Sequence, residues 1–179
     1  MLMKSFLRRI YYRLFYRDLP SYRWKLKEKA SASRGIRKRL YVHRWNMFQK
    51  KCGAGISVTA EFAGPPTFPH GFCGVFVSAG AKVGKGCVIF HQVTIGSNTL
   101  PDSKHPGAPT IGDNVYIGVG AKIIGGIHIG NNVRIGANCV VTRDVPDNTT
   151  VVLPSVRLIT RENSPDNTFL PWSDFEGTS

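Results

Sequence analysis

Aliphatic residues recur every six positions along the middle of the chain, and this spacing predicts the fold. They form one run of four and one run of six, and the step within each run is six throughout. Six of them are followed directly by glycine. A helix repeats every 3.6 residues and a strand every two, so a period of six suits neither as a long element. The aliphatic positions are Val77, Val83, Ile89, Ile95, Ile111, Ile117, Ile123, Ile129, Ile135 and Val141.

A six-residue period is typical of very short strands joined by tight turns. We expect the aliphatic side chain to point inward and the following glycine to supply a backbone conformation that other residues reach with difficulty. Three hexads make one triangular coil, and coils stacked about 4.8 Å apart bury a continuous aliphatic column. The pattern therefore predicts an all-β parallel β-helix. The same step continues more weakly upstream, at Ile56, Phe62 and Phe68.

Two insertions interrupt the repeat. The step between the two runs is sixteen residues instead of six, so ten residues are inserted, at about positions 99–108. A step of nine after Phe68 adds three residues there. Loops that break a regular solenoid usually lie on its binding face. His70 lies at the short insertion and His105 in the long one, so both histidines are candidates for chemistry.

Charge divides the chain into two unlike parts. The net charge of +13 arises almost entirely from residues 1–51, which hold sixteen Lys and Arg against two acidic residues. We expect residues 1–51 to form a basic helical segment, 52–160 the β-helix and 161–179 an irregular tail. A basic segment suits an anionic membrane surface or an acidic partner, or it is simply a solvated helical pair. Nucleic acid is not the expected partner.

Two helices are expected in the basic segment. Apolar residues at three-four spacing predict the first over positions 1–17, ended by Pro20. The second is expected at about positions 36–49, with Ile36, Leu40 and Met47 at compatible spacing. Arginines interrupt the hydrophobic run, so we expect neither a signal peptide nor a membrane span. The expected location is cytoplasmic, with peripheral contact at the inner membrane face as an option.

The four cysteines have no regular spacing and no CxxC pair. Without a secretory signal they are expected to be thiols and not disulfides. Cys87 and Cys139 take the inward small-residue place of their hexads, which indicates core positions. Cys73 follows His70 by three residues, but nothing near it argues for a lowered pKa, so a small residue in a tight loop is the favoured interpretation.

Three segments in order carry a resemblance to a known family. They are residues 70–77, HGFCGVFV; residues 89–96, IFHQVTIG; and Lys104-His105-Pro106. With the hexads, they resemble the left-handed β-helix acyltransferases, in particular serine acetyltransferases and the related enzymes that O-acetylate surface polysaccharides. The likeness covers about residues 56–159.

The resemblance implies an acetyl-CoA-dependent acetyltransferase that works as a homotrimer, with active sites between neighbouring solenoids and no metal. It implies that His70 is the general base and that His105 and Lys104 help to hold the acceptor. The acetyl-CoA groove would be lined by residues that match the family's positions: Gly96, Ser97, Val119, Arg134 and Ala137.

Departures from the family bear on the acceptor. Serine acetyltransferases carry an aspartate well before the catalytic histidine, and the corresponding region here, residues 55–59, has no acidic residue. Their larger helical domain, which supplies another acid to the acceptor site, corresponds here to a short basic segment. We therefore rank a sugar or polysaccharide hydroxyl slightly above serine. An amino-sugar N-acetyltransferase and a non-catalytic scaffold docked on a membrane are the alternatives.

Hexad counting places the candidate histidines. His70 and His91 each follow an inward residue by two positions, so they should meet at one corner of adjacent coils, with Val119 next along it. His91 is a candidate for substrate binding or for a simple hydrogen-bonding ladder. His105 lies at a different corner and can meet His70 only across a subunit boundary. Imidazole is the usual base near neutral pH. A zinc lyase is disfavoured because the histidines lack a suitable five-residue spacing.

Overall fold

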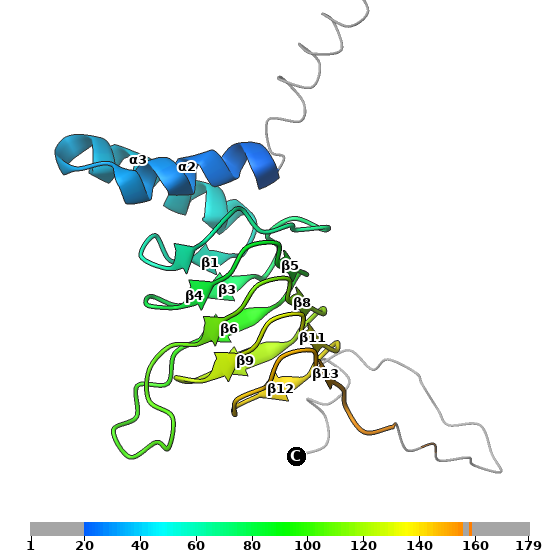
Figure 1. The fold of residues 1–179 in the computed structure, drawn as a ribbon. Coiled ribbons are helices and arrows are strands. Elements are labelled where there is room, and N and C mark those ends of the chain that lie inside the picture. Colours follow the sequence, from blue (N-terminus) through cyan, green and yellow to red (C-terminus); the bar gives the residue numbers. More distant parts are fainter. Residues whose placement is uncertain (1–19, 156–157, 159–179) are drawn as a thin grey trace, which may run out of the picture.

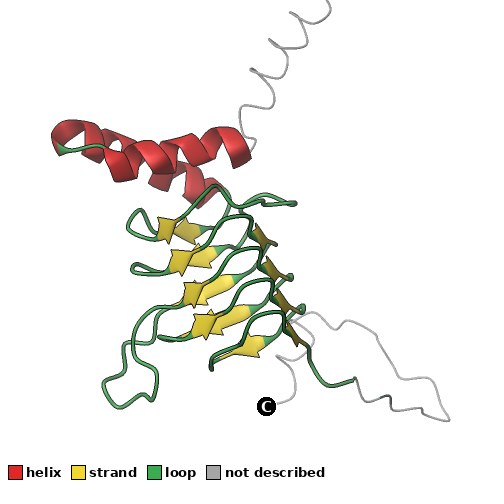
Figure 2. Ribbon diagram, in the orientation of Figure 1, coloured by secondary structure: helices red, strands yellow, loops and turns green. Residues whose placement is uncertain are grey.

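The computed structural model describes residues 20–155 and residue 158, with side chains from residue 24 onward. Thirteen short strands form three parallel sheets that wind as a three-sided β-helix (Figures 1 and 2). Sheet A contains β1 (Gly55–Ile56), β3 (Phe76–Val77), β6 (Thr94–Gly96), β9 (Lys122–Ile124) and β12 (Val140–Val141). Sheet B contains β2 (Glu61–Phe62), β4 (Lys82–Val83), β7 (Thr110–Ile111) and β10 (His128–Ile129). Sheet C contains β5 (Val88–Ile89), β8 (Tyr116–Ile117), β11 (Arg134–Ile135) and β13 (Thr150–Val151).

The predicted aliphatic column is the core. All ten aliphatic hexad positions are buried, and strand register stacks each one on its equivalent in the next coil, as for Ile95 on Ile123 and Ile117 on Ile135. The upstream extension is confirmed because Ile56 pairs with Val77. Burying an aliphatic side chain contributes roughly 1.5–3 kcal/mol, so the column is the main source of stability. The small positions two residues earlier are buried too, including Cys87 and Cys139.

The six glycines that follow aliphatic hexad positions are required by close packing between coils. The expectation that they supply an unusual backbone angle is wrong. None of these six glycines has a positive φ. A Cβ on Gly112 would lie 2.9 Å from the carbonyl carbon of Gly130, and one on Gly118 would lie 2.8 Å from the nitrogen of Ala137. Such distances are shorter than van der Waals contact, so the coils can approach this closely only without a side chain there.

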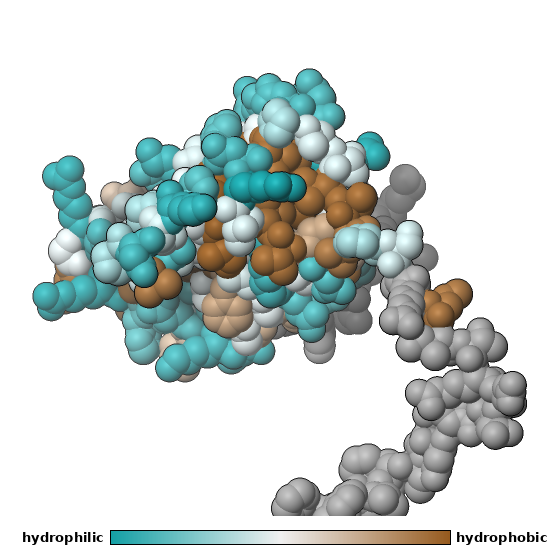
Figure 3. Space-filling model, turned by 90° about the horizontal axis from the view of Figure 1, so that it is seen from below, coloured by the Kyte–Doolittle hydropathy of each residue, from teal (hydrophilic) through white to brown (hydrophobic). Residues whose placement is uncertain are grey.

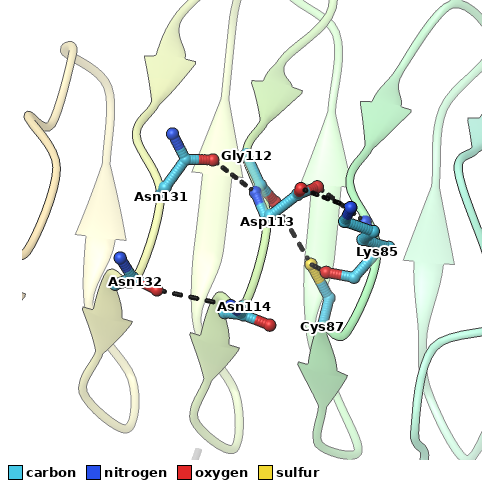
Figure 4. Close-up of polar contacts among 7 residues, drawn as sticks. All are labelled: Lys85, Cys87, Gly112, Asp113, Asn114, Asn131 and Asn132. Carbon is cyan, nitrogen blue, oxygen red and sulfur yellow. Dashed lines mark hydrogen bonds and ion pairs between the residues drawn. The ribbon is translucent and has the colours of Figure 1, made fainter.

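Positive φ angles occur at the corners, where asparagines form ladders between coils. Asn114, Asn132 and Asn148 all have φ near 57° and follow one another up the corner between sheets B and C. Asn114 Nδ2 donates to Asn132 Oδ1 over 3.4 Å, and the N–H of Asp113 donates to Asn131 Oδ1 over 2.8 Å (Figure 4). Asparagine tolerates the left-handed region better than most residues, so it suits these turns.

At the same corner, a carboxylate and a thiol both form hydrogen bonds with neighbouring coils. Asp147 accepts hydrogen bonds from the N–H and the side-chain amide of Asn131, which hold the pKa of its carboxyl group below the usual value. Burial raises the pKa of the Cys87 thiol, which donates to the carbonyl of Gly112 over 3.3 Å (Figure 4). The four cysteines all lie in the described residues and form no disulfide.

Two helices cover the first coil (Figure 1). They are α2 (Pro20–Ala32) and α3 (Gly35–Lys51). The helix expected over positions 1–17 lies outside the described residues. Pro20, expected to end a helix, instead begins α2, where its missing N–H and fixed φ are no disadvantage. Within the described residues no helix is long and apolar enough to cross a bilayer.

Helix side chains pair with the exposed edge of the first coil. The N–H of Ile56 donates to Gln49 Oε1, and Trp45 Nε1 donates to the carbonyl of Ile56 over 3.0 Å. Further along the edge, Ser31 Oγ donates to Val58 O and Lys27 Nζ donates to the carbonyl of Ala60 over 2.8 Å. A free strand edge is a template for pairing with another chain, and here the helices occupy it.

Aromatic rings seal the same end. The cluster comprises Trp24, Trp45, Phe48, Phe62, Phe68 and Phe72, with ring centroids 4.5–6.4 Å apart along its contacts. Lys27 is buried beside it, with Nζ 4.7 Å from the Phe62 ring centroid. Burial lowers the pKa of this amine, and the charge of Glu28 partly opposes that shift.

Helix α3 buries one face on the first coil. Trp45, Phe48 and Gln49 are buried, whereas Ile36, Leu40 and Met47, whose spacing predicted the helix, are exposed. The opposite end of the β-helix has no such helical cover among the described residues. Seen from that end, hydrophobic residues gather within a hydrophilic rim (Figure 3), and an open cavity there is lined by Val140, Val141, Val145, Val151 and Val152.

Removing the side-chain amide of Gln49, which joins α3 to the first coil, should destabilise the fold measurably. Gln49→Met keeps the volume of the side chain but leaves the buried N–H of Ile56 without its acceptor, so we expect a loss of about 1–3 kcal/mol in the free energy of unfolding. Urea unfolding measures this loss. Lys50→Met is the matched control, because Lys50 is exposed on the same helix. Equal stability of the two variants would contradict the role assigned to Gln49.

Candidate active site

One corner of the β-helix, between sheets C and A, carries the first group of predicted site residues. Gln92 N–H donates to the carbonyl of Cys73 over 2.8 Å, and Gly120 N–H donates to that of His91 over 3.1 Å. Asn138 N–H then donates to the carbonyl of Val119 over 2.8 Å. The residues that stack in this order are Cys73, His91, Val119 and Ala137. The prediction that Val119 follows His91 along the corner is therefore confirmed.

His70 meets His91 through its side chain and not through backbone stacking. The backbone neighbour of His91 is Cys73, because three inserted residues separate His70 from the regular corner position. The insertion nevertheless directs the two imidazoles together, with ring centroids 5.3 Å apart and planes at 85°. His70 is exposed and His91 is half-buried, so the outer imidazole is the one accessible to a substrate.

Two aromatic residues beside His70 were not identified from the sequence. The ring of Phe90 lies 5.6 Å from that of His70 and 5.1 Å from that of Tyr116. Phe90 occupies the place after the aliphatic where the next coils have Gly118 and Gly136. This substitution of a large ring for glycine was the available signal. Together, His70, Phe90 and Tyr116 form an aromatic strip on the outside of the corner.

The imidazole pair has no carboxylate partner. Of the described residues, none with a carboxylate forms an ion pair or hydrogen bond with His70 or His91. Nδ1 of His91 is buried without a hydrogen-bond partner. Glu61, the nearest acid in sequence, lies on β2 of sheet B and is paired in register with Lys82.

His105 lies in the long loop, at the corner between sheets A and B. Asn98 and Gly107 exchange two backbone hydrogen bonds of 2.8 Å and close the loop, which projects from the side of the stack (Figure 1). Ser103 Oγ accepts from Asn98 Nδ2 and from the N–H of His105. The carbonyl of His105 accepts from Gly126 N–H over 3.0 Å. The backbone of His105 is thus fixed, while its imidazole and the neighbouring Lys104 are exposed.

The residues expected to line the acetyl-CoA groove fall into two groups in one chain. Val119 and Ala137 lie at the corner with His91, and Arg134 projects from β11 beside Tyr116. The other group, Gly96 and Ser97, lies at the far ends of the sheet A strands, where the long loop begins. One chain therefore does not bring the five residues together.

Basic side chains near this corner differ in whether they are free to bind an anionic ligand. Arg134 is exposed, and its side chain forms no hydrogen bond or ion pair with the described residues. Lys122 Nζ donates to the carbonyls of Gln92 and Gly120, over 2.6 and 2.9 Å. His128 is exposed on β10 of sheet B, away from the imidazole pair. Within the described part of the chain, no group of three or more His, Cys, Asp or Glu could hold a metal ion.

The comparisons with known proteins agree on one type of domain. Residues 108–143 match the family described as bacterial transferase hexapeptide (six repeats). The serine acetyltransferase of Synechococcus elongatus is 47% identical over 92 residues, which are 51% of this chain and 36% of that protein. The Helicobacter pylori serine acetyltransferase is 37% identical over 94 residues, covering 52% of this chain and 53% of that protein.

Solved structures extend the likeness to most of the chain. Serine acetyltransferase isoform 3 from Entamoeba histolytica, in complex with cysteine, matches with a TM-score of 0.66 and 28% identity, over 80% of this chain and 51% of that one. Soybean serine acetyltransferase matches with a TM-score of 0.64 and 32% identity, over 77% and 56%. The fold is thus a left-handed parallel β-helix similar to that of these acetyltransferases. The chain spans between about a third and a half of the two curated relatives.

The packing of the long loop on Gly126 can be tested directly. A Cβ on Gly126 would collide with the carbonyl oxygen of Pro106, so Gly126→Ala should displace the loop and expose the paired amides of Asn98 and Gly107. Hydrogen exchange should show faster exchange at both amides. Gly64→Ala is the control, because its Cβ would meet only Lys85 Cβ, at 3.8 Å, and neither glycine has a positive φ. Unchanged protection in Gly126→Ala would refute this packing.

Proposed function

Because the β-helix of this chain is similar to that of serine acetyltransferases, we propose that the protein transfers acetyl from acetyl-CoA to a hydroxyl group. The observation that carries the proposal is the exposed imidazole of His70, which His91 contacts at the corner between sheets C and A. His105 offers another exposed imidazole at a different corner, in the long loop. The relatives' names support the reaction class.

His70 acts as the general base in this proposal. A neutral hydroxyl attacks a thioester slowly because its oxygen keeps the proton as the new bond forms. Imidazole accepts that proton while the oxygen bonds to the acetyl carbon and the carbon–sulfur bond breaks. The proton then passes from the imidazolium to the departing CoA thiolate, which leaves as the thiol. His91 contacts His70 edge-to-face and thereby restricts the orientation of the base.

The acceptor and the acetyl donor meet between two chains. His70 and His105 lie at the two ends of sheet A, so a neighbouring subunit's long loop must approach the His70 corner for both to contact one acceptor. The two groups of groove residues, at the same two corners, meet in the same way, and Arg134 is available for a CoA phosphate. Holding both substrates together supplies much of the acceleration. In a closed ring such as a homotrimer, the long loop of every chain meets the His70 corner of its neighbour.

Different observations favour two different acceptors, serine and a sugar hydroxyl. The relatives are serine acetyltransferases, which favours serine. The aromatic strip of His70, Phe90 and Tyr116 favours a sugar hydroxyl, because the apolar face of a sugar ring packs well on aromatic rings. Within the same reaction we therefore keep a sugar or polysaccharide acceptor ahead of serine.

Replacing the base should abolish most of the turnover. For His70→Ala we expect acetyl-CoA consumption to fall roughly 10²- to 10⁴-fold, because removal of a general base normally costs that much. The thiol released from acetyl-CoA is measured with serine, simple sugars and polysaccharide fragments as acceptors. His128→Ala is the matched control, since His128 is an exposed histidine away from the site.

The outcomes of this experiment separate the alternatives. A loss of only a few-fold in His70→Ala would assign the base elsewhere, with His105 as the next candidate. Turnover with an amino sugar and none with hydroxyl acceptors would indicate N-acetylation. No acetyl-CoA consumption by the unaltered protein with any acceptor would contradict the proposed reaction and favour a non-catalytic role.

A further inference from the structure

Helix α3 has a second apolar face that nothing in the described structure covers. Its inner face packs on the first coil through Trp45, Phe48 and Gln49. On the outside, Ile36 is 84% exposed, Leu40 55% and Met47 48%. Large apolar side chains at this degree of exposure are unusual when several fall together on one helix, and they mark an interaction surface.

The exposed apolar residues form one narrow stripe. At 100° per residue, Ile36, Leu40 and Met47 fall within about 40° of one another around the helix, and their stripe faces away from Trp45. Along the helix they span eleven residues, or about 16 Å at 1.5 Å per residue. We call this the outer stripe of α3. It lies at the end of the molecule opposite β13 (Figure 1).

Basic side chains line both sides of the outer stripe. The same helical geometry places three of them on one flank and two on the other, all exposed, and α3 contains no acidic residue. On the first flank are Arg37, Arg44 and Lys51; on the second are Arg39 and Lys50. An apolar stripe between two rows of cations is the arrangement of helices that lie flat in the interface of an anionic bilayer.

We propose that the outer stripe of α3 docks the protein on an anionic lipid surface. Ile36, Leu40 and Met47 would enter the boundary between headgroups and acyl chains, while the flanking Arg and Lys contact lipid phosphates and carboxylates. The charge selects this occupant. A second copy of α3 would bring like charges together, and a polyanion such as nucleic acid would not require the apolar residues.

The proposed orientation leaves the long loop accessible. Since α2 and α3 lie on the end of the β-helix, a membrane against α3 approaches the end of the stack, whereas the long loop projects from its side (Figure 1). The protein would bind as a peripheral partner of the membrane, and the inference holds whether or not the proposed acetyl transfer is correct. Binding and turnover are measured separately, so the failure of one is distinguishable from that of the other.

Cosedimentation of the full chain with lipid vesicles tests the proposal. We expect binding to vesicles of phosphatidylcholine with about a quarter phosphatidylglycerol, little binding to pure phosphatidylcholine, and weakening at 0.5 M salt. The triple variant Arg37→Gln, Arg44→Gln, Lys51→Gln should bind roughly 100-fold more weakly, since each basic residue near an anionic surface contributes about fivefold. The double variant Leu40→Ser, Met47→Ser should lose about tenfold.

Matched controls carry the same chemical changes elsewhere. Lys82→Gln, Lys85→Gln, Arg143→Gln removes three exposed charges from the β-helix, and Val140→Ser, Val152→Ser replaces two apolar residues that are 64% and 71% exposed at the far end. Both should bind as the unaltered protein does. Circular dichroism and thermal unfolding confirm that each variant is folded.

Three results would overturn the proposal. Equal binding to neutral and anionic vesicles, or to neither at low salt, would exclude an anionic lipid surface. If Leu40→Ser, Met47→Ser binds vesicles as well as the unaltered protein does, the apolar residues have no role in binding. Charge alone would then explain the binding, and an acidic protein or a nucleic acid would bind in the same way. A smaller assembly of the double variant in sedimentation, with unchanged vesicle binding, would assign the outer stripe to contact between copies.

Discussion

The close stacking of each coil on the next is the constraint on which the rest of the structure depends. Inward aliphatic side chains form one column, and glycines such as Gly112 and Gly118 allow backbones to approach to distances that a Cβ would prevent. This stacking fixes the register of all three sheets. It therefore also fixes which side chains reach each corner. The position of every candidate site residue follows from the count of residues between it and the nearest inward aliphatic.

Much of the fold could be predicted because a solenoid is nearly one-dimensional. The aliphatic column, the extension to Ile56 and the two insertions all follow from local spacing. The reason for the glycines was wrong, because close approach between coils is a three-dimensional property that spacing does not report. The spacing of Ile36, Leu40 and Met47 indicated a helix, but it did not show which face of α3 is buried. That helix has apolar residues on two opposite faces, and only contact with the first coil selects Trp45 over Leu40.

The candidate site could be predicted in part, and the division has a physical cause. Counting hexads predicted that His70 and His91 meet at one corner, and the structure confirms that their rings are in contact. It did not indicate that Cys73 is the backbone neighbour of His91, because an insertion can shift the chain without moving a side chain away. Phe90 and Tyr116 were missed because the contacts that join them to His70 run between coils, from His70 to Phe90 and from Phe90 to Tyr116. The separation of His70 and His105 at two corners was foreseen, and it makes the proposed site dependent on a second chain.

Mixing two inactive variants tests this dependence most directly. His70→Ala and His105→Ala subunits are each expected to have little activity alone. If each site takes His70 from one chain and His105 from its neighbour, oligomers reassembled from equal amounts should recover about a quarter of the unaltered activity, since one site in four then receives both histidines. No recovery, with mixed oligomers confirmed by mass, would show that both histidines act within one chain and would contradict the account.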